Sequence, residues 1–181
     1  MADSKVVFIT GASSGIGYAT ALAFTRRGYQ VAGTARRADK LATLQTAVQT
    51  LPVGHGEFLP LTVDVRNAQA VEAAVQAAVQ HFGRLDILVA NAGVGQRGAI
   101  VEAAWEDLDT LLRTNLDGLM HSIRCAVPAI RQGKSGGQIV LISSVVSNMT
   151  APYTATYAAS KAFVSSLAKS LRLELEADHI G

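Results

Sequence analysis

Short apolar segments alternate along the chain with longer segments in which apolar residues recur at helical spacing. Continuous apolar runs are typical of strands buried on both faces of a parallel sheet. They predict strands over Lys5–Thr10, Gln30–Ala35, Glu57–Val63, Leu85–Ala90 and Gln138–Ser143. The remaining segments predict helices over Ile16–Arg27, Asp39–Leu51, Ala68–Phe82, Ala103–Ile130 and Tyr153–Ala177, with a loop over Gly133–Gly137.

This alternation of strands and helices indicates the α/β class, with a doubly wound parallel sheet in three layers and right-handed crossovers. The chain has no internal repeat and no interdomain linker, so we expect a single domain over residues 1–181. Ligands of such sheets bind beyond the carboxyl ends of the strands. The residues of interest should therefore follow strands or lie on the adjacent helices.

A glycine-rich turn follows the first predicted strand and precedes the first helix. Its glycines stand at positions 11, 15 and 17, in the spacing Gly-x-x-x-Gly-x-Gly. Such a turn presents backbone N–H groups and the positive end of a helix dipole to a diphosphate. The alternative is a tight strand–helix connection that binds no ligand.

The end of the second predicted strand favours NADP over NAD. An acidic residue there would bind the ribose 2′-hydroxyl of NAD, but this chain has Ala35. Arg36 and Arg37 follow, and a guanidinium suits a 2′-phosphate because it forms charge-assisted, often bidentate hydrogen bonds. Solvated loop arginines are the alternative interpretation.

Two helical segments carry residues with acid–base or positioning potential. Tyr157 and Lys161 are four residues apart and share one helix face. A nearby ammonium favours the charged form of a phenol, which suits proton transfer. Asn115 lies within a helical stretch, where asparagine is a poor residue unless its amide has a partner. A surface position is the alternative for Asn115, and the helix could break near Asn115–Gly118.

Taken in order, these motifs resemble the short-chain dehydrogenase/reductase family. The chain has the Thr-Gly-x-x-x-Gly-x-Gly turn, then Asn-Ala-Gly from position 91, then Asn115. Ser144 follows, thirteen positions before Tyr157, and the Tyr-x-x-x-Lys motif closes the series. The resemblance covers essentially the whole chain. It implies an NADP-dependent oxidoreductase that interconverts a carbonyl compound and an alcohol by hydride transfer.

The resemblance also implies a role for each motif residue. Tyr157 is the expected general acid/base, and Ser144 is expected to hydrogen-bond the substrate oxygen unless it is a turn serine without chemistry. Lys161 is expected to assist Tyr157 and to hold the nicotinamide ribose, while Asn115 anchors a relay water. The residues implied to bind the coenzyme are Gly11, Ser13, Ser14, Gly15, Ile16, Gly17, Arg36, Arg37, Asp64, Val65, Asn91, Ala92, Gly93, Tyr157 and Lys161.

Two of the implied coenzyme residues have specific expected contacts. In the family, an aspartate placed like Asp64 hydrogen-bonds the adenine amino group, and the alternative is that Asp64 caps the helix that follows. The Asn91 side chain is expected to tie neighbouring strands. In the glycine turn, where some NADP-preferring members carry a basic residue, this chain has Ser13 and Ser14.

Other function classes compete with this interpretation. A dinucleotide-binding regulator on the same fold has no need of Asn115, Ser144, Tyr157 and Lys161 together, so the full set favours an enzyme. Another Rossmann enzyme, such as a methyltransferase, is disfavoured by the glycine spacing and by the basic end of the second strand.

Composition excludes several partners. The net charge is only +2 and no basic run exceeds two residues, so nucleic acid is not indicated. The four histidines are scattered and Cys125 is the single cysteine, so we expect neither a metal site nor an internal disulfide. The N-terminal apolar run is too short for a signal peptide, and no segment approaches the length of a membrane span. We therefore expect a cytoplasmic protein that acts on a small molecule.

The resemblance also bears on assembly. It implies a homodimer or homotetramer through the Ala103–Ile130 and Tyr153–Ala177 helices, although Phe163, Leu167, Leu171 and Leu175 are most simply a core-facing stripe.

The resemblance also bears on whether the domain is complete at its C-terminal end. Family members continue through sixth and seventh strands, so we expect a C-terminally incomplete domain with an open fifth strand. Such a chain should bind NADPH weakly, turn over slowly or not at all, and self-associate through that strand.

Overall fold

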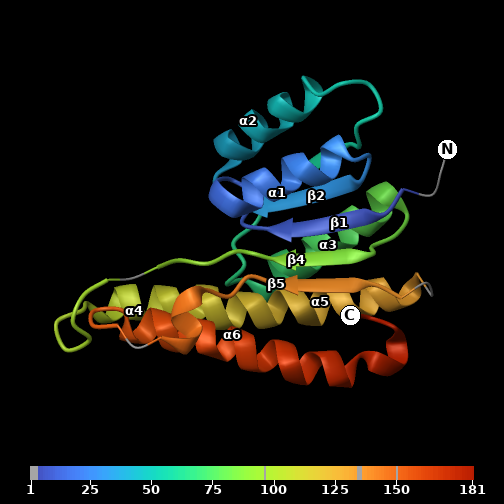
Figure 1. Ribbon diagram of the computed structural model, residues 1–181. Helices are drawn as coiled ribbons and strands as arrows, with labels where there is room; N and C mark the ends of the chain where they lie inside the picture. The colour runs from blue at the N-terminus through green and yellow to red at the C-terminus, as the bar shows by residue number, and fades with distance from the viewer. Residues whose placement is uncertain (1–3, 96, 134–135, 150) are drawn as a thin grey trace.

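The computed structural model describes residues 4–95, 97–133, 136–149 and 151–181. Within these residues, one parallel sheet has the strand order β3-β2-β1-β4-β5 (Figure 1). In its register, Phe8 lies opposite Ala32 on one side and Leu88 on the other. This topology confirms the expected doubly wound sheet. The strands are β1 (Val6–Thr10), β2 (Gln30–Ala35), β3 (Phe58–Thr62), β4 (Ile87–Ala90) and β5 (Gln138–Leu141).

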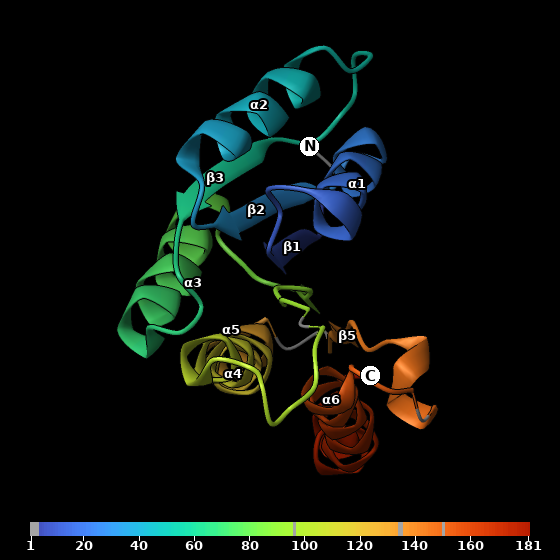
Figure 2. The same ribbon diagram turned by 90° about the vertical axis from the view of Figure 1, so that its left-hand side faces the viewer.

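Helices cover both faces of the sheet (Figure 2). On one face, α1 (Gly15–Arg26) and α2 (Ala38–Gln49) pack on a core that includes Val7 and Ile9. On the other face, the alternating residues Val6 and Phe8 belong to a second core. That core is covered by α3 (Ala68–Phe82), α5 (Gly118–Gln132) and α6 (Ala155–Glu174).

The long predicted helix over Ala103–Ile130 does not break. It begins later, with α4 (Trp105–Leu112), and continues through a π-helical turn, η1 (Arg113–Asp117), directly into α5. As a result, α4 extends the line of α5 beyond the ends of the strands (Figure 1). The predicted disturbance near Asn115 is thus a local widening of the helix, and such π-turns often lie at functional sites.

Several element ends differ from the prediction by one to a few residues, as expected where chains fray. The strand predicted over Leu85–Ala90 begins at Ile87. Just before it, Asp86 is buried, and its Oδ2 accepts a hydrogen bond from the Val6 backbone N–H at 2.8 Å. The helix predicted from Tyr153 begins at Ala155, because Tyr153 has a left-handed φ of 63°. Two residues of the predicted loop Gly133–Gly137, namely 134 and 135, lie outside the described residues.

The outer edge of β5 differs from the expectation of an open strand. The Ile139 N–H donates to the Gly181 carbonyl oxygen at 2.7 Å, and the Gly181 N–H donates to that of Gly137 at 3.0 Å. Ile180 forms a parallel bridge with Gly137. The first half of this edge is therefore paired, and the prediction of a fully unpaired edge is wrong there.

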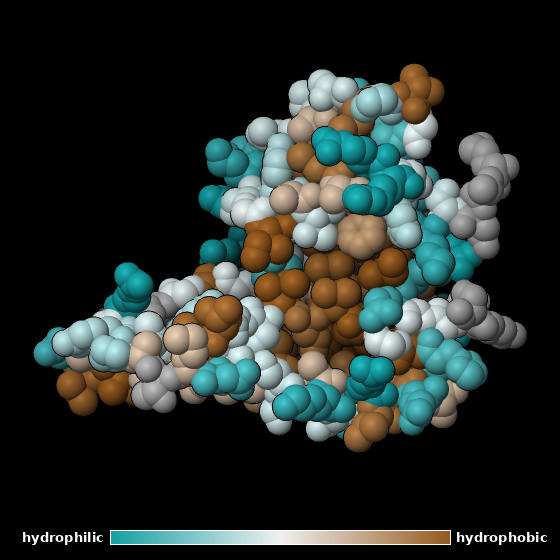
Figure 3. All heavy atoms as spheres, viewed as in Figure 1, coloured by the Kyte–Doolittle hydropathy of each residue, from teal (hydrophilic) through white to brown (hydrophobic). Residues whose placement is uncertain are grey.

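The sheet face that carries α1 is only partly covered. Figure 3 shows a concave apolar surface below α1, over the β4 and β5 region. Val140 on β5 is 37% exposed, and its neighbours Ile87 and Ile142 are partly buried.

The apolar stripe predicted along α6 lies against the core. Phe163, Leu167 and Leu171 pack on the core cluster and Leu175 is 5% exposed, so the stripe is core-facing as its spacing predicts. Among the residues that the structure describes, no helix has the length and apolar character needed to cross a membrane.

Candidate active site

A cleft of about 730 Å³ opens at the carboxyl ends of the strands. It lies next to the β1–α1 turn and between β1 and β4, where the order of the strands reverses. Parallel sheets of this kind bind their ligands at such a point. The cleft is lined by all the sequence-predicted site residues except Gly15, Gly17 and Asn115. It is also lined by residues outside that predicted set, namely Thr34, Ala35, Val63, Val94, Gly95, Thr114, Ile142, Ser143 and Val145.

The floor of the cleft is the glycine turn, which allows no side chain at two positions. Gly11 has a φ of 71°, and a Cβ there would lie 2.8 Å from the Ala92 Cα. A Cβ on Gly17 would collide with the Gly11 carbonyl oxygen and the Asn91 amide. Close backbone approach of this kind is what a diphosphate-binding turn requires, so the turn fits a dinucleotide.

Asn91 holds the glycine turn to the neighbouring strand. Its Nδ2 donates to the carbonyl oxygens of Thr10 at 3.0 Å and Gly11 at 3.1 Å. In return, the Thr10 hydroxyl oxygen accepts the backbone N–H groups of Asn91 and Ala92, each at 3.1 Å. The side chain therefore ties β1 to β4 and fixes the shape of the floor.

Two arginines stand at the rim, where the second strand ends. A guanidinium nitrogen of Arg37 donates to the hydroxyl oxygens of both Ser13 and Ser14, each at 3.0 Å. Arg36 is exposed and also lines the cleft. These contacts bring positive charge to the glycine turn itself, although the turn contains no basic residue.

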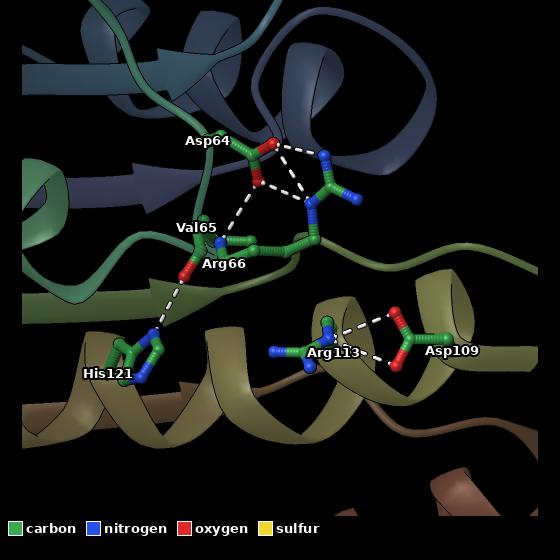
Figure 4. A network of polar contacts seen from close by, with 6 residues as sticks. All are labelled: Asp64, Val65, Arg66, Asp109, Arg113 and His121. Carbon is green, nitrogen blue, oxygen red and sulfur yellow. Dashed lines mark hydrogen bonds and ion pairs between the residues drawn. The ribbon is translucent and has the colours of Figure 1, made fainter. Parts of the chain in front are cut away.

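Asp64 follows β3 and is held by Arg66, two residues later (Figure 4). The hydrogen bond from this guanidinium holds the pKa of the Asp64 carboxyl below its ordinary value, against the opposing effect of burial. The helix that follows is capped instead by Asn67, whose Oδ1 accepts from the Ala70 N–H at 3.1 Å. The interpretation of Asp64 as the side-chain cap of this helix is therefore wrong.

Asn115 lies at the centre of the π-turn and is only 2% exposed, which excludes the surface alternative. Its Oδ1 accepts from the Val94 N–H at 2.8 Å, and its Nδ2 donates to the Val94 carbonyl oxygen at 3.0 Å. The same Nδ2 donates to the Ser160 hydroxyl at 3.0 Å. Asn115 thus joins the loop after β4 to α6 from behind the cleft. Sequence reasoning missed Ser160, although it lies within the Tyr-x-x-x-Lys motif.

The two serines after β5 have different surroundings. The Ser143 hydroxyl donates to the Lys161 carbonyl oxygen at 3.0 Å and lies 2.7 Å from the Ser165 hydroxyl, so it is engaged with α6. The Ser144 hydroxyl accepts only a long contact of 3.4 Å from the Val146 N–H and lines the cleft. Ser144 is therefore the better placed of the two to reach a ligand.

Tyr157 and Lys161 come from consecutive turns of α6 and both line the cleft. The Lys161 Nζ lies 5.9 Å from the centre of the Tyr157 ring. Lys161 is 7% exposed, and this burial lowers the pKa of its ammonium group. The Nζ donates to the Ile142 carbonyl oxygen at 2.8 Å, which fixes the long side chain across the cleft.

This sheet and its cleft define a Rossmann-type α/β protein. The model of the family described as short chain dehydrogenase matches residues 5–181, and the chain belongs to this family.

Proteins similar to this chain include a 3-ketodihydrosphingosine reductase of Bacteroides thetaiotaomicron, with 34% identity over 97% of this chain and 60% of that protein. The chain thus spans 60% of the length of that relative. Carveol dehydrogenase from Mycobacterium avium in complex with NAD has a TM-score of 0.91 and 31% identity over 97% of this chain and 67% of its own. An alcohol dehydrogenase from Thermococcus sibiricus complexed with 5-hydroxy-NADP has a TM-score of 0.87 and 30% identity, covering 94% of this chain and 71% of its own.

Proposed function

We propose that this chain is an oxidoreductase that uses NADP to interconvert a carbonyl compound and an alcohol, with Tyr157 as general acid/base. The observation that carries the proposal is the convergence of Ser144, Tyr157 and Lys161 in the same cleft as the glycine turn. Family membership and the names of the similar proteins support the class of reaction.

The residues present fit a dinucleotide. The glycine floor admits a diphosphate against backbone N–H groups, with the rest of the cleft extending to Asp64 on one side and Tyr157 on the other. When bound, the nicotinamide supplies or accepts the hydride.

Residues of this chain transfer the proton. In reduction, the Tyr157 hydroxyl gives its proton to the substrate oxygen, and the Ser144 hydroxyl donates a hydrogen bond to that oxygen. The Lys161 ammonium favours the phenolate that remains on Tyr157 and holds the nicotinamide ribose. Asn115 lies behind the cleft, where it fixes the loop after β4 against α6. We also propose that Asn115 anchors the water that returns a proton to Tyr157.

We propose NADP over NAD because of the two arginines at the rim of the cleft. Arg37 bridges Ser13 and Ser14, and Arg36 stands beside it, so two guanidinium groups face the place of a ribose 2′-phosphate. Ala35 leaves no carboxylate there to bind a 2′-hydroxyl or to repel a phosphate. The related structures include both an NAD and an NADP-type complex, so the test must compare the two coenzymes.

Self-association through α5 and α6 is also proposed. Met120 on α5 is 37% exposed and Leu173 on α6 is 74% exposed, so these helices retain apolar surface after the core is formed. Sedimentation velocity of the wild type and Leu173→Lys tests this: an oligomer that the substitution weakens supports it, and a monomeric wild type contradicts it.

The function is tested by titrating the purified chain with NADPH and NADH and then screening carbonyl compounds for NADPH oxidation. Tighter binding of NADPH and turnover that requires Tyr157 support the proposal. Binding without turnover for any carbonyl or alcohol would support a dinucleotide-binding regulator instead.

A further inference from the structure

Arg66 binds the carboxylate of Asp64, which is one of the residues that line the cleft (Figure 4). The Arg66 backbone N–H donates to Oδ1 at 3.0 Å. Its Nε lies 3.1 Å from Oδ1 and 3.0 Å from Oδ2, and its terminal nitrogen lies 2.6 Å from Oδ2. Three different N–H groups of one residue therefore bind this carboxylate.

The Asp64 carboxylate has few acceptor sites left for a ligand. A carboxylate offers about four lone-pair sites, so the three N–H groups of Arg66 leave about one for a ligand. Arg36 adds a second positive charge nearby, and together the two arginines keep the pKa of Asp64 low. The remaining site is therefore an acceptor only, with no proton to donate.

The segment that carries this carboxylate is fixed from a second side. His121 on α5 places its Nδ1 3.0 Å from the Val65 carbonyl oxygen, so the ring donates there and holds the backbone between Asp64 and Arg66 (Figure 4). Asp109 on α4 also attracts Arg66, although it pairs directly with Arg113. The position of the carboxylate is therefore set before any ligand arrives.

We propose that Arg66 is a positioning residue that makes the cleft specific for a 6-amino purine, because it orients Asp64 and leaves it one acceptor site. This inference rests on the proposed function and on the expectation, from the family resemblance, that Asp64 hydrogen-bonds the adenine amino group of the coenzyme. Adenine presents an N–H donor at this site. Hypoxanthine presents a carbonyl oxygen at the same ring position, and two acceptors then face each other without a proton between them.

The test compares NADPH with its 6-oxo analogue, reduced nicotinamide hypoxanthine dinucleotide phosphate. Dissociation constants are measured by nicotinamide fluorescence for the wild type, Arg66→Ala and Arg66→Lys. Arg131→Ala is the matched control, because it removes an arginine from the Arg131–Asp178 pair, and neither residue lines the cleft or contacts Asp64 or Arg66. Circular dichroism confirms that each variant is folded.

We expect the wild type to prefer NADPH by about tenfold or more, as for a hydrogen bond to a charged group. In Arg66→Ala this ratio should fall to about threefold or less, mainly through weaker NADPH binding, because Asp64 is no longer oriented. Arg66→Lys should be intermediate, since an ammonium keeps the charge without the fixed pair of N–H groups. Arg131→Ala should keep the wild-type ratio.

The possible failures are distinguishable. A wild type that binds NADPH and its 6-oxo analogue equally, or an unchanged ratio in Arg66→Ala, overturns this inference and leaves the proposed function intact. A wild type that binds no nicotinamide dinucleotide contradicts the proposed function, and it contradicts this inference as well.

Discussion

The ammonium nitrogen of Lys161 lies 2.8 Å from the carbonyl oxygen of Ile142, and this contact connects α6 to the end of β5. The lysine is 7% exposed, and burial lowers the pKa of its ammonium group. The folded chain therefore holds this proton less tightly than the unfolded chain does. Such a difference links the protonation of Lys161 to the stability of the fold.

The first prediction concerns the pH dependence of that stability. Because the folded pKa of Lys161 lies below its unfolded pKa, its charge costs folding free energy at neutral pH, and the cost disappears as the pH rises through the folded pKa to the unfolded value. We expect the free energy of unfolding of the wild type, minus that of Lys161→Met, to increase between about pH 7 and about pH 10. Urea unfolding at each pH measures it, and a constant or falling difference would show that burial does not disfavour the charge.

The second prediction concerns the proton donor. Tyr157→Phe should abolish turnover and leave the dissociation constant of NADPH nearly unchanged, because only the hydroxyl is lost. Lys161→Ala should impair both turnover and coenzyme binding, since Lys161 has a role in each. Steady-state kinetics with a substrate found in the screen and fluorescence titration separate the two effects. If Tyr157→Phe kept most of the activity, the proposed mechanism would be wrong.

The third prediction concerns coenzyme choice. Arg36→Ala should weaken NADPH binding by about tenfold to a hundredfold, equivalent to about 1.5–3 kcal/mol for a charge-assisted hydrogen bond, while NADH binding changes little. Arg27→Ala is a suitable control because Arg27 stands at the far end of α1, where its guanidinium donates to the Ala23 carbonyl oxygen. An equal loss for NADPH and NADH would argue against a 2′-phosphate site at this rim.

The fourth prediction concerns the buried amide of Asn115. Asn115→Ala leaves the N–H and carbonyl groups of Val94 without their side-chain partner, so it should lower the free energy of unfolding by about 1–3 kcal/mol. Asn148→Ala, at an exposed position, should change it by less than about 0.5 kcal/mol. Chemical denaturation of both variants compares them, and similar effects would mean that the Asn115 contacts contribute little.

The parts of this structure that follow from local sequence were predictable. Continuous apolar runs identified all the strands of the described sheet. The order of the motifs selected Ser144, Tyr157 and Lys161, which line the same cleft as the glycine turn. These features depend on residues near one another in the chain or on the edge to which parallel strands point.

Other features depend on side chains that meet only after folding. Arg37 reaches Ser13 across 24 residues, and Asn115 reaches Ser160 across 45, and no local pattern encodes either contact. Arg66 lies only two residues from Asp64, but its hydrogen bonds to the carboxylate depend on the conformation of the turn between them. Similarly, the pairing of Ile180 and Gly181 with the edge of β5 could not be predicted from hydrophobic periodicity, because a segment of two residues has no periodic pattern.

The crowding around Gly11 and Gly17 limits where this protein can change its ligand. The floor of the cleft consists of backbone atoms in contact with backbone atoms, and a single added carbon at either position collides with its neighbours. Substitution there can destroy binding but cannot redirect it, since every dinucleotide offers the floor the same diphosphate. Divergence toward a new coenzyme must therefore proceed through the side chains around the perimeter, and a library that seeks altered coenzyme use should vary these residues and keep the glycines constant.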